Sequence, residues 1–246
     1  MHLPDRSFWD NYWSKEIHGE LSEFIFGPLL AKYLYNVETY LEIGCSPGTS
    51  LIHFANHYGY QVNGIDYSSL DLTRSMLQSH GISNYKLFEE DFLYFQSDET
   101  FDVVASYGFV EHFDHPENII HRQASFVKPG GYLIVEVPNI RYFNYLLYRI
   151  FQPELLKVHN RTIMNINTLQ RSVLDLEDFT ILYCNFYKTS FISFNIHNAM
   201  IAAHPLRRLF MQIARRTLDI IHMNDIPNRF FSPYLILVAR KNSIQS

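Results

Sequence analysis

Short apolar runs alternate with helix-length segments along the first 139 residues, with glycines and prolines between them. Two of the runs are apolar without a break, at residues 103–105 and 133–135. Unbroken apolar strands are typical of a parallel sheet that is covered by helices on both faces. The pattern therefore predicts an α/β protein with a Rossmann-like, doubly wound sheet built from βαβ units.

Seven segments have the length and composition of strands. They are residues 40–43, 61–66, 85–89, 101–106, 131–137, 179–186 and 234–239. We expect helices to begin at Thr49 or Ser50 and after Ser68–Ser69, the second one ending at Gly81. Residues 128–131, Lys-Pro-Gly-Gly, are predicted to form a turn before the fifth strand, because proline and paired glycines disfavour regular elements.

The chain of 246 residues, with 47% hydrophobic and 18% charged residues, has the composition of one well-cored domain. We expect a single domain over residues 1–246. Its parts are an N-terminal helical prelude (1–36), a cofactor-binding core (37–139), cap or substrate segments (140–178 and 190–230) and the last strands (179–189 and 231–241).

Aromatic residues recur at helical spacing in the prelude, at Phe8, Trp9, Tyr12 and Trp13. Two interpretations remain open for them. They either form the face of a helix that packs on the sheet, or they contact a ligand directly.

The two cysteines, Cys45 and Cys184, are too few for a disulfide framework and have no zinc-ligand spacing. We therefore expect free thiols in a reducing compartment. The sequence shows neither a secretory leader nor an apolar stretch of about 20 residues that would span a membrane. These features predict a cytoplasmic protein.

The net charge of −5 is unevenly distributed, since residues 1–139 carry 7 Lys/Arg and 19 Asp/Glu, whereas residues 140–246 carry 13 and 6. The acidic first part argues against a nucleic-acid partner. Residues 204–218 form a candidate basic amphipathic helix. It would bind an anionic, phosphate-linked sugar, associate weakly with an anionic membrane surface, or serve as a lid helix with a solvated basic face.

A tight glycine-containing turn joins the first predicted strand to the first helix. Gly44 and Gly48 allow the backbone to approach a ligand closely, and the helix N-terminus offers free N–H groups. Asp66 follows 18 positions after Gly48, at the end of the next strand, where a carboxylate can accept both hydroxyls of a ribose. Together these residues predict a nucleoside-containing cofactor.

The turn lacks the third glycine of the GxGxxG fingerprint that nicotinamide and flavin enzymes share. It resembles instead the E/DxGxGxG motif of class I methyltransferases, with Ser46 in place of the middle glycine. Three more segments resemble motifs of that family in the same order. They are residues 89–92, 101–113 with its Glu-His pair, and 127–138.

The resemblance implies S-adenosylmethionine as cofactor and a seven-stranded sheet whose last strand, within residues 231–240, is antiparallel and lies beside the fifth. It also implies that Asp91 meets the adenine amino group, with Phe92 beside the ring. The expected cofactor-binding residues are Glu42, Gly44, Cys45, Ser46, Gly48, Asp66, Tyr67, Ser68, Asp91, Phe92, Ser106 and Tyr107.

Methyl transfer to a hydroxyl needs alignment and is helped by a general base. His112 is the first candidate, because it follows the fourth strand at the end of the sheet where ligands bind. A histidine that orders the loop or packs on the cofactor is the alternative. Glu111 is a second candidate and also fits a hydrogen bond to backbone at the cofactor mouth. His159, His197 and His204, in the expected cap, are equally open as bases.

We expect no metal site, because the 12 histidines include no His-Glu-x-x-His or comparable spacing. The predicted reaction is methyl transfer to a small molecule, at a hydroxyl oxygen, with a sugar or polysaccharide precursor as one acceptor. N-methylation of a small molecule is the nearest alternative. A non-catalytic S-adenosylmethionine-binding partner subunit and a nicotinamide-dependent oxidoreductase are two others, and the joint presence of Asp66 and Asp91 argues against the first of these.

Overall fold

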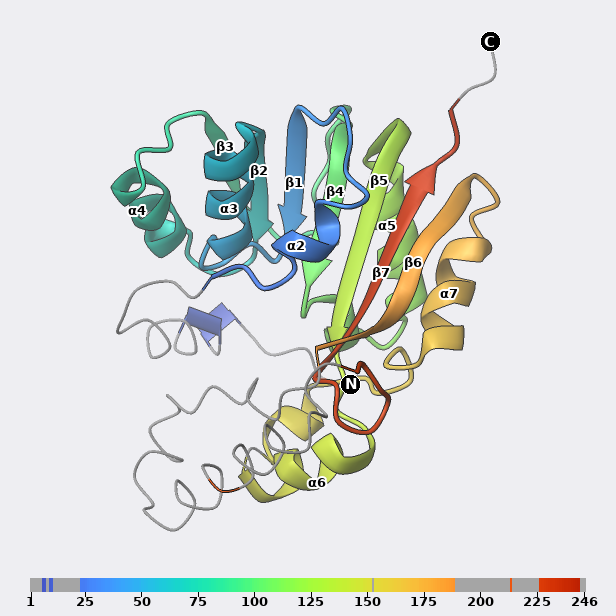
Figure 1. Cartoon of the computed structure of the whole chain (residues 1–246). Coiled ribbons are helices and arrows are strands. Elements are labelled where there is room, and N and C mark those ends of the chain that lie inside the picture. Colours follow the sequence, from blue (N-terminus) through green and yellow to red (C-terminus); the bar gives the residue numbers. More distant parts are fainter. Residues whose placement is uncertain are drawn as a thin grey trace.

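The computed structural model describes residues 6–7, 9–10, 23–151, 153–188, 213 and 226–243. Its centre is a sheet with the strand order β3-β2-β1-β4-β5-β7-β6 (Figure 1). The strands are β1 (Thr39–Ile43), β2 (Gln61–Asp66), β3 (Tyr85–Glu89), β4 (Phe101–Tyr107), β5 (Val127–Pro138), β6 (Phe179–Tyr187) and β7 (Tyr234–Lys241).

The helices of the described residues include two short 3₁₀ turns. They are α2 (Gly27–Leu30), α3 (Thr49–Tyr58), α4 (Asp71–Ser79), η1 (Val110–His112), α5 (Pro116–Ser125), α6 (Tyr142–Phe151), η2 (Leu155–Lys157) and α7 (Ile166–Leu174). The helix predicted to begin at Thr49 or Ser50 is α3, which lies between two left-handed glycines, Gly48 at φ 99° and Gly59 at φ 70°. The helix predicted to end at Gly81 is α4.

Strands β1 to β5 pair in parallel, and β7 lies antiparallel between β5 and β6. The seven-stranded, mostly parallel sheet with an antiparallel last strand beside the fifth is thus confirmed. The strand order reverses between β1 and β4, which are neighbours in the sheet. In open α/β sheets, ligands bind at the carboxyl ends of the strands at this kind of switch point.

Successive side chains of each strand enter two separate cores, one on each face of the sheet. On β5, Leu133 and Val135 pack with residues of α5 and α7, whereas Ile134 packs with residues of α2, α3 and α4. Figure 1 shows α3 in front of the sheet and α5 behind it. Because both faces are covered, the strands carry the unbroken apolar runs of the sequence.

The turn predicted at residues 128–131 is wrong, because these residues belong to β5. Val127 already pairs with Phe101 of β4, and the next pair is Tyr132 with Val103, so four residues of β5 lie opposite one of β4. Gly130 takes φ 80° within this irregularity. The sheet accommodates the proline and glycines as a bulge rather than as a separate turn.

The segment 140–178, expected as a cap, divides into two parts. Helix α6 lies beyond the carboxyl ends of the parallel strands (Figure 1). Helix α7 instead covers the sheet beside β6, and its Leu169 and Val173 are buried in the core with α5. Of the expected cap segment 190–230, only residues 213 and 226–230 lie within the described residues.

In the prelude, Trp9 is described, whereas Phe8, Tyr12 and Trp13 lie outside the described residues. Every helix in the described ranges is too short or too polar to cross a lipid bilayer.

Candidate functional site

A cavity of about 630 Å³ opens at the carboxyl ends of the parallel strands. Its walls come from β1, β2, β4 and β5, from the loops after β1 to β4, and from the start of β7. The N-terminal segment and the region of α6 and η2 complete them. This volume is in the range of small-molecule and cofactor sites. The cavity lies at the switch point of the strand order, where the fold is expected to bind a ligand.

The loop after β1 forms one wall of the cavity. Gly44 takes φ 75°, and a Cβ there would come within 2.7 Å of the Phe109 ring, so only glycine fits without displacement. Cys45, also in the wall, is buried against Gly64, and burial raises the pKa of its thiol well above the ordinary value. Gly48 is outside the cavity wall and serves as the left-handed N-cap of α3.

Asp66 lies at the end of β2 and holds the loop after β1 in place. Its Oδ2 accepts a hydrogen bond from the backbone N–H of Ser46 at 2.9 Å. Its Oδ1 accepts from the backbone N–H of Ser68 at 2.8 Å and from the Ser68 hydroxyl at 2.6 Å. Asp66, Ser46 and the half-exposed Tyr67 line the cavity, while Ser68 is buried behind Asp66. The carboxylate is therefore fixed at the cavity edge by its neighbours.

Glu42 and Tyr107 lie side by side in the cavity wall, at the ends of β1 and β4. Burial raises the pKa of the Glu42 carboxyl to about 8, although the Ser50 hydroxyl donates a hydrogen bond to it. The Tyr107 ring stacks on Phe26, with centroids 5.5 Å apart and planes at 12°. Glu42 is therefore largely uncharged near neutral pH in this cavity.

Asp91 and Phe92 follow β3 and line the cavity together. The Asp91 Oδ1 accepts from the backbone N–H of Leu93 at 2.9 Å, which closes the turn. Ser106, in contrast, is fully buried outside the cavity wall, and its hydroxyl bonds the side chain of Gln123 on α5. Since neighbouring side chains of a strand point to opposite faces, Tyr107 at the cavity places Ser106 behind the sheet.

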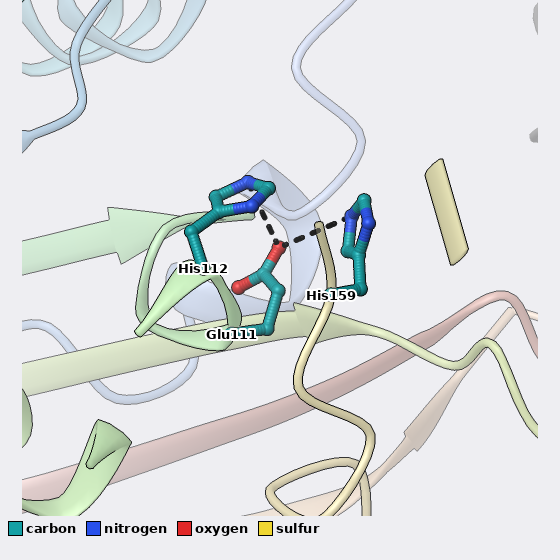
Figure 2. A group of neighbouring side chains, drawn as sticks. All are labelled: Glu111, His112 and His159. Carbon is teal, nitrogen blue, oxygen red and sulfur yellow. Dashed lines mark ion pairs between the residues drawn. The ribbon is translucent and has the colours of Figure 1, made fainter. Parts of the chain in front are cut away.

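Glu111, His112 and His159 all line the cavity, and Figure 2 shows their side chains close to one another. The Glu111 Oε1 lies 3.8 Å from Nε2 of His112 and 4.0 Å from Nε2 of His159. Burial raises the pKa of Glu111 to about 8 and, together with the neighbouring His159, lowers that of His112 to about 4. The structure thus brings both catalytic candidates together with one of the three cap histidines. His197 and His204 lie outside the described residues.

The sequence reasoning did not single out several residues of the wall. Phe24, Phe26, Tyr148, Leu155 and Tyr234 add an apolar, aromatic lining. Their positions give no sequence signal, because they come from four separate places in the chain. Glu136 was also missed. It is a lone carboxyl within the apolar run of β5, and burial holds its pKa well above the usual range. A lone acid in a strand that is covered on both faces is a signal that could have found it.

The described residues of the wall carry acidic side chains without a lysine or arginine. The acids are Glu42, Asp66, Glu90, Asp91, Glu111 and Glu136. The basic second part of the chain therefore supplies no cation to the described wall. The candidate basic helix at residues 204–218 lies outside the described residues apart from Ile213.

A family model described as a methyltransferase domain matches residues 13–212, most of the chain. A ubiquinone biosynthesis O-methyltransferase of Hydrogenovibrio crunogenus is 34% identical over 113 residues, which are 45% of this chain and 46% of that protein. The chain thus spans less than half the length of that relative. An EEF1A lysine methyltransferase 2 of Danio rerio is 26% identical over 61% of this chain and 75% of that protein.

Among solved structures, the chain is similar to a methyltransferase of Thiobacillus denitrificans, whose crystal structure contains S-adenosyl-L-homocysteine. The TM-score is 0.58, the identity is 17%, and the alignment covers 98% of each chain. At this identity the likeness concerns the fold.

Proposed function

This chain belongs to the class I S-adenosylmethionine-dependent methyltransferases, and we propose that it methylates a hydroxyl oxygen of a ring-containing small molecule. The observation that carries the proposal is that one cavity is lined both by polar residues after β1, β2 and β3 and by the Glu111–His112–His159 group. We assign the first set to a cofactor end and the second, with the Trp9 ring beside His112, to an acceptor end.

The first end fits the cofactor. Asp66 keeps its carboxylate at the cavity edge, where Ser46 and Ser68 use three of its roughly four lone-pair sites and the remaining site is suited to a ribose hydroxyl. Gly44 lines the cavity without a Cβ, which would clash with the Phe109 ring, and Asp91 with Phe92 is suited to the adenine amino group and ring. In this proposal Glu42, Cys45, Ser46, Tyr67 and Tyr107 complete the wall around the cofactor.

S-adenosylmethionine held by these residues would supply an electrophilic methyl group, with its sulfur as the leaving group that keeps the electron pair. The protein's part is to exclude water, to align the acceptor and to take its proton. The Glu111–His112 pair lies at the other end of the same cavity, with the Trp9 ring 4.9 Å from the His112 ring. We assign the handling of the acceptor proton to this pair.

The acceptor end favours a ring without strong negative charge. Trp9, Tyr148 and Tyr234 line the cavity and can stack on an aromatic ring or on the apolar face of a sugar. The described wall contains no lysine or arginine to pair with an anionic group. A phenol and the hydroxyl of a sugar or polysaccharide precursor are therefore both acceptors to test. A phosphate-linked sugar would need the basic residues within 204–218 to pair with its phosphate.

Methylation of an amine is the second candidate, and the acidic wall favours it. A cationic amine would be attracted to Glu111 and Glu136 in their ionised forms. One of the relatives is named for lysine methylation, which is transfer to nitrogen. The oxygen acceptor remains the primary proposal, because the relative of highest identity reported above is named as an O-methyltransferase.

The proposal is tested in two steps. Calorimetric titration with S-adenosylhomocysteine, and with NAD as control, should show one-to-one binding of the first compound alone. Transfer of a labelled methyl group to a panel of phenols, sugars and amines should then give an O-methylated product. Binding of NAD alone would contradict the cofactor assignment, and labelling of amines only would replace oxygen by nitrogen as the acceptor atom.

A further inference from the structure

We propose that Glu111, His112 and His159 bind one divalent first-row transition-metal ion at the acceptor end of the cavity. Each residue offers one ligand atom, and the three atoms lie within 4.8 Å of one another. Figure 2 shows the Glu111 carboxylate between the two imidazoles. The site stands on this geometry alone, whereas the role given to it below rests on the proposed methylation of a hydroxyl.

The hydrogen bonds of the two histidines orient them as metal ligands. Nδ1 of His112 lies 2.9 Å from the carbonyl oxygen of Val158, and Nδ1 of His159 contacts the carbonyl oxygen of Leu155. A carbonyl oxygen only accepts, so each Nδ1 carries the hydrogen and donates it. In a neutral ring the lone pair is then on Nε2. Metal-binding histidines are typically fixed in this way, by a hydrogen bond from the other ring nitrogen to a backbone carbonyl.

The Glu111 carboxylate has the two histidines as neighbours but no hydrogen-bond partner among the described residues. The residue is fully buried, and neither Oε1 nor Oε2 has a hydrogen-bond partner among the described residues. Its separations of 3.8 and 4.0 Å from the two Nε2 atoms are too long for hydrogen bonds. Buried carboxylates without partners are costly, and coordination of a cation is one of the few ways to compensate them.

The distances leave space for an ion between the three atoms. In a tetrahedral site with ligand bonds near 2.0–2.1 Å, neighbouring ligand atoms are about 3.4 Å apart. The separations of 3.8 and 4.0 Å require the side chains to close by a few tenths of an ångström. The third separation, between the ligand atoms of the two histidines, is at most 4.8 Å, so it closes by no more than about 1.4 Å, which rotation of the imidazoles can supply. Two imidazoles and one carboxylate favour zinc, cobalt or iron over magnesium and calcium, which prefer oxygen ligands.

Three protein ligands leave at least one coordination position open, as in catalytic metal sites. The open side of this group faces the cavity, because all three residues line it. A cation held here would attract the acceptor's hydroxyl oxygen and lower the pKa of that hydroxyl, so the acceptor would release its proton to the solvent as it binds, before water is excluded for methyl transfer. Glu111 and His112 would then manage the acceptor proton through the cation that they bind.

The sequence did not indicate this site, because its ligands are far apart along the chain. His159 follows His112 by 47 positions, which matches no short metal-binding motif. The chain segment before His159, including η2, returns to the end of β4 and completes the group. Asn160 holds the segment there, because its backbone N–H donates to the carbonyl oxygen of Glu111 at 2.6 Å and its side-chain amide donates to the carbonyl oxygens of Phe113 and Asp114.

The test uses Co²⁺, which absorbs visible light when bound by such ligands. Full-length protein stripped with EDTA would be titrated with Co²⁺ and, separately, with Mg²⁺. We expect saturation at one equivalent of Co²⁺ with new visible bands, and at least tenfold weaker binding of Mg²⁺. E111Q and H159Q should each lower the Co²⁺ affinity at least tenfold.

A matched control is H115A, because His115 forms an exposed pair with Glu117 at 3.2 Å, outside the cavity. This variant should keep the affinity and bands of the wild type. Circular dichroism and S-adenosylhomocysteine binding, measured on the same samples, report folding and the cofactor site. If E111Q does not fold, the Co²⁺ affinity of H159Q alone tests the proposal.

The metal proposal is overturned if folded wild-type protein shows no saturable Co²⁺ binding, or if H159Q binds Co²⁺ as the wild type does. Binding of Co²⁺ without binding of S-adenosylhomocysteine would leave the metal site standing and remove the proposed function. The two failures are therefore distinguishable.

Discussion

The carboxylate of Asp66 accepts the backbone N–H of Ser46 at 2.9 Å, so a single side chain ties the loop after β1 to the end of β2. The same carboxylate binds the backbone and hydroxyl of Ser68. The residue proposed to hold the ribose also shapes the loop proposed to hold the rest of the cofactor. Its replacement should therefore affect binding more than a single lost contact would.

We predict that Asp66→Asn lowers the affinity for S-adenosylhomocysteine at least tenfold, about 1.4 kcal/mol, while the protein still folds. The amide has the same shape but loses the charge and one of the accepting oxygens. Calorimetric titration measures the effect. Asp71→Asn is the control, because Asp71 is exposed on α4 and pairs only with Arg74 among the interactions described. Equal affinities in the two variants would contradict the assignment of Asp66.

Gly44→Ala should destabilise the protein and impair cofactor binding. Gly44 takes φ 75°, and a Cβ there would lie 2.7 Å from the Phe109 ring. Gly81 is a matched control, since it takes φ 72° but a Cβ there would meet nothing within 4 Å. We expect Gly44→Ala to cost roughly 1–3 kcal/mol more in the free energy of unfolding than Gly81→Ala. Denaturant titration of both variants measures the difference, and equal costs would show that Phe109 yields without penalty.

Glu42 should make the cofactor-free protein less stable as pH rises. Burial raises its pKa from 4.5 to about 8 in the folded state. A raised pKa contributes stability that is complete below the unfolded pKa and is lost as pH rises through the folded value. We therefore expect Glu42→Gln to lose less unfolding free energy than the wild type between about pH 5 and pH 8, by an amount on the order of a few kcal/mol.

Urea denaturation of both proteins across this range measures that difference. The comparison matters because Glu111 and Glu136 also have raised pKa values and act in the same direction in both proteins. If the free energy of unfolding changes with pH in the same way in both proteins, ionisation of Glu42 does not destabilise the fold.

Asp102 should stabilise the folded protein at neutral pH and lose this contribution as pH falls, the opposite of Glu42. Burial raises the pKa of this carboxyl, but hydrogen bonds from Lys128 at 2.9 Å and from Thr39 and Glu38 outweigh burial and lower it overall. A lowered pKa gives stability above the unfolded value that is lost as pH falls through the folded value. Asp102→Asn should therefore be less stable than the wild type at pH 7, with the gap narrowing below about pH 4.

Thermal unfolding of both proteins from pH 7 to pH 3 measures this gap. A constant gap across the acid range would assign the loss to hydrogen-bond geometry rather than to the charge of Asp102.

Much of the fold could be predicted from local patterns. The unbroken apolar runs at residues 103–105 and 133–135 indicated strands that are covered on both faces, and β4 and β5 have this environment. The antiparallel placement of β7 beside β5 came from the family resemblance rather than from the apolar pattern, and the structure adds β6 as its other neighbour. The proline and glycines at 128–131 misled the prediction, because a strand pair can absorb irregular residues as a bulge.

The site was predicted only in part. Residues beside a strand end could be recognised, whereas residues that are far apart along the chain could not be grouped. Gly44 and Asp66 could be predicted because each lies at the end of a strand that the sequence indicates. The structure places both in the cavity wall. The side to which a residue faces is harder to predict, as the buried position of Ser106 shows. One step along β4 decides between the cavity and the opposite face.

The sequence by itself determined the order of strands and helices along the chain and the chemical character of the loops after them. Hydrophobic periodicity and turn residues reveal these features, because both act over a few neighbouring positions. Only the tertiary structure decided that His159 joins Glu111 and His112, and that Glu136 shares a cavity with Glu42. These groups are separated by tens of residues, and their approach depends on how whole elements pack. Burial then sets their protonation, since the cost of ionising a carboxyl depends on the surroundings that the fold builds around it.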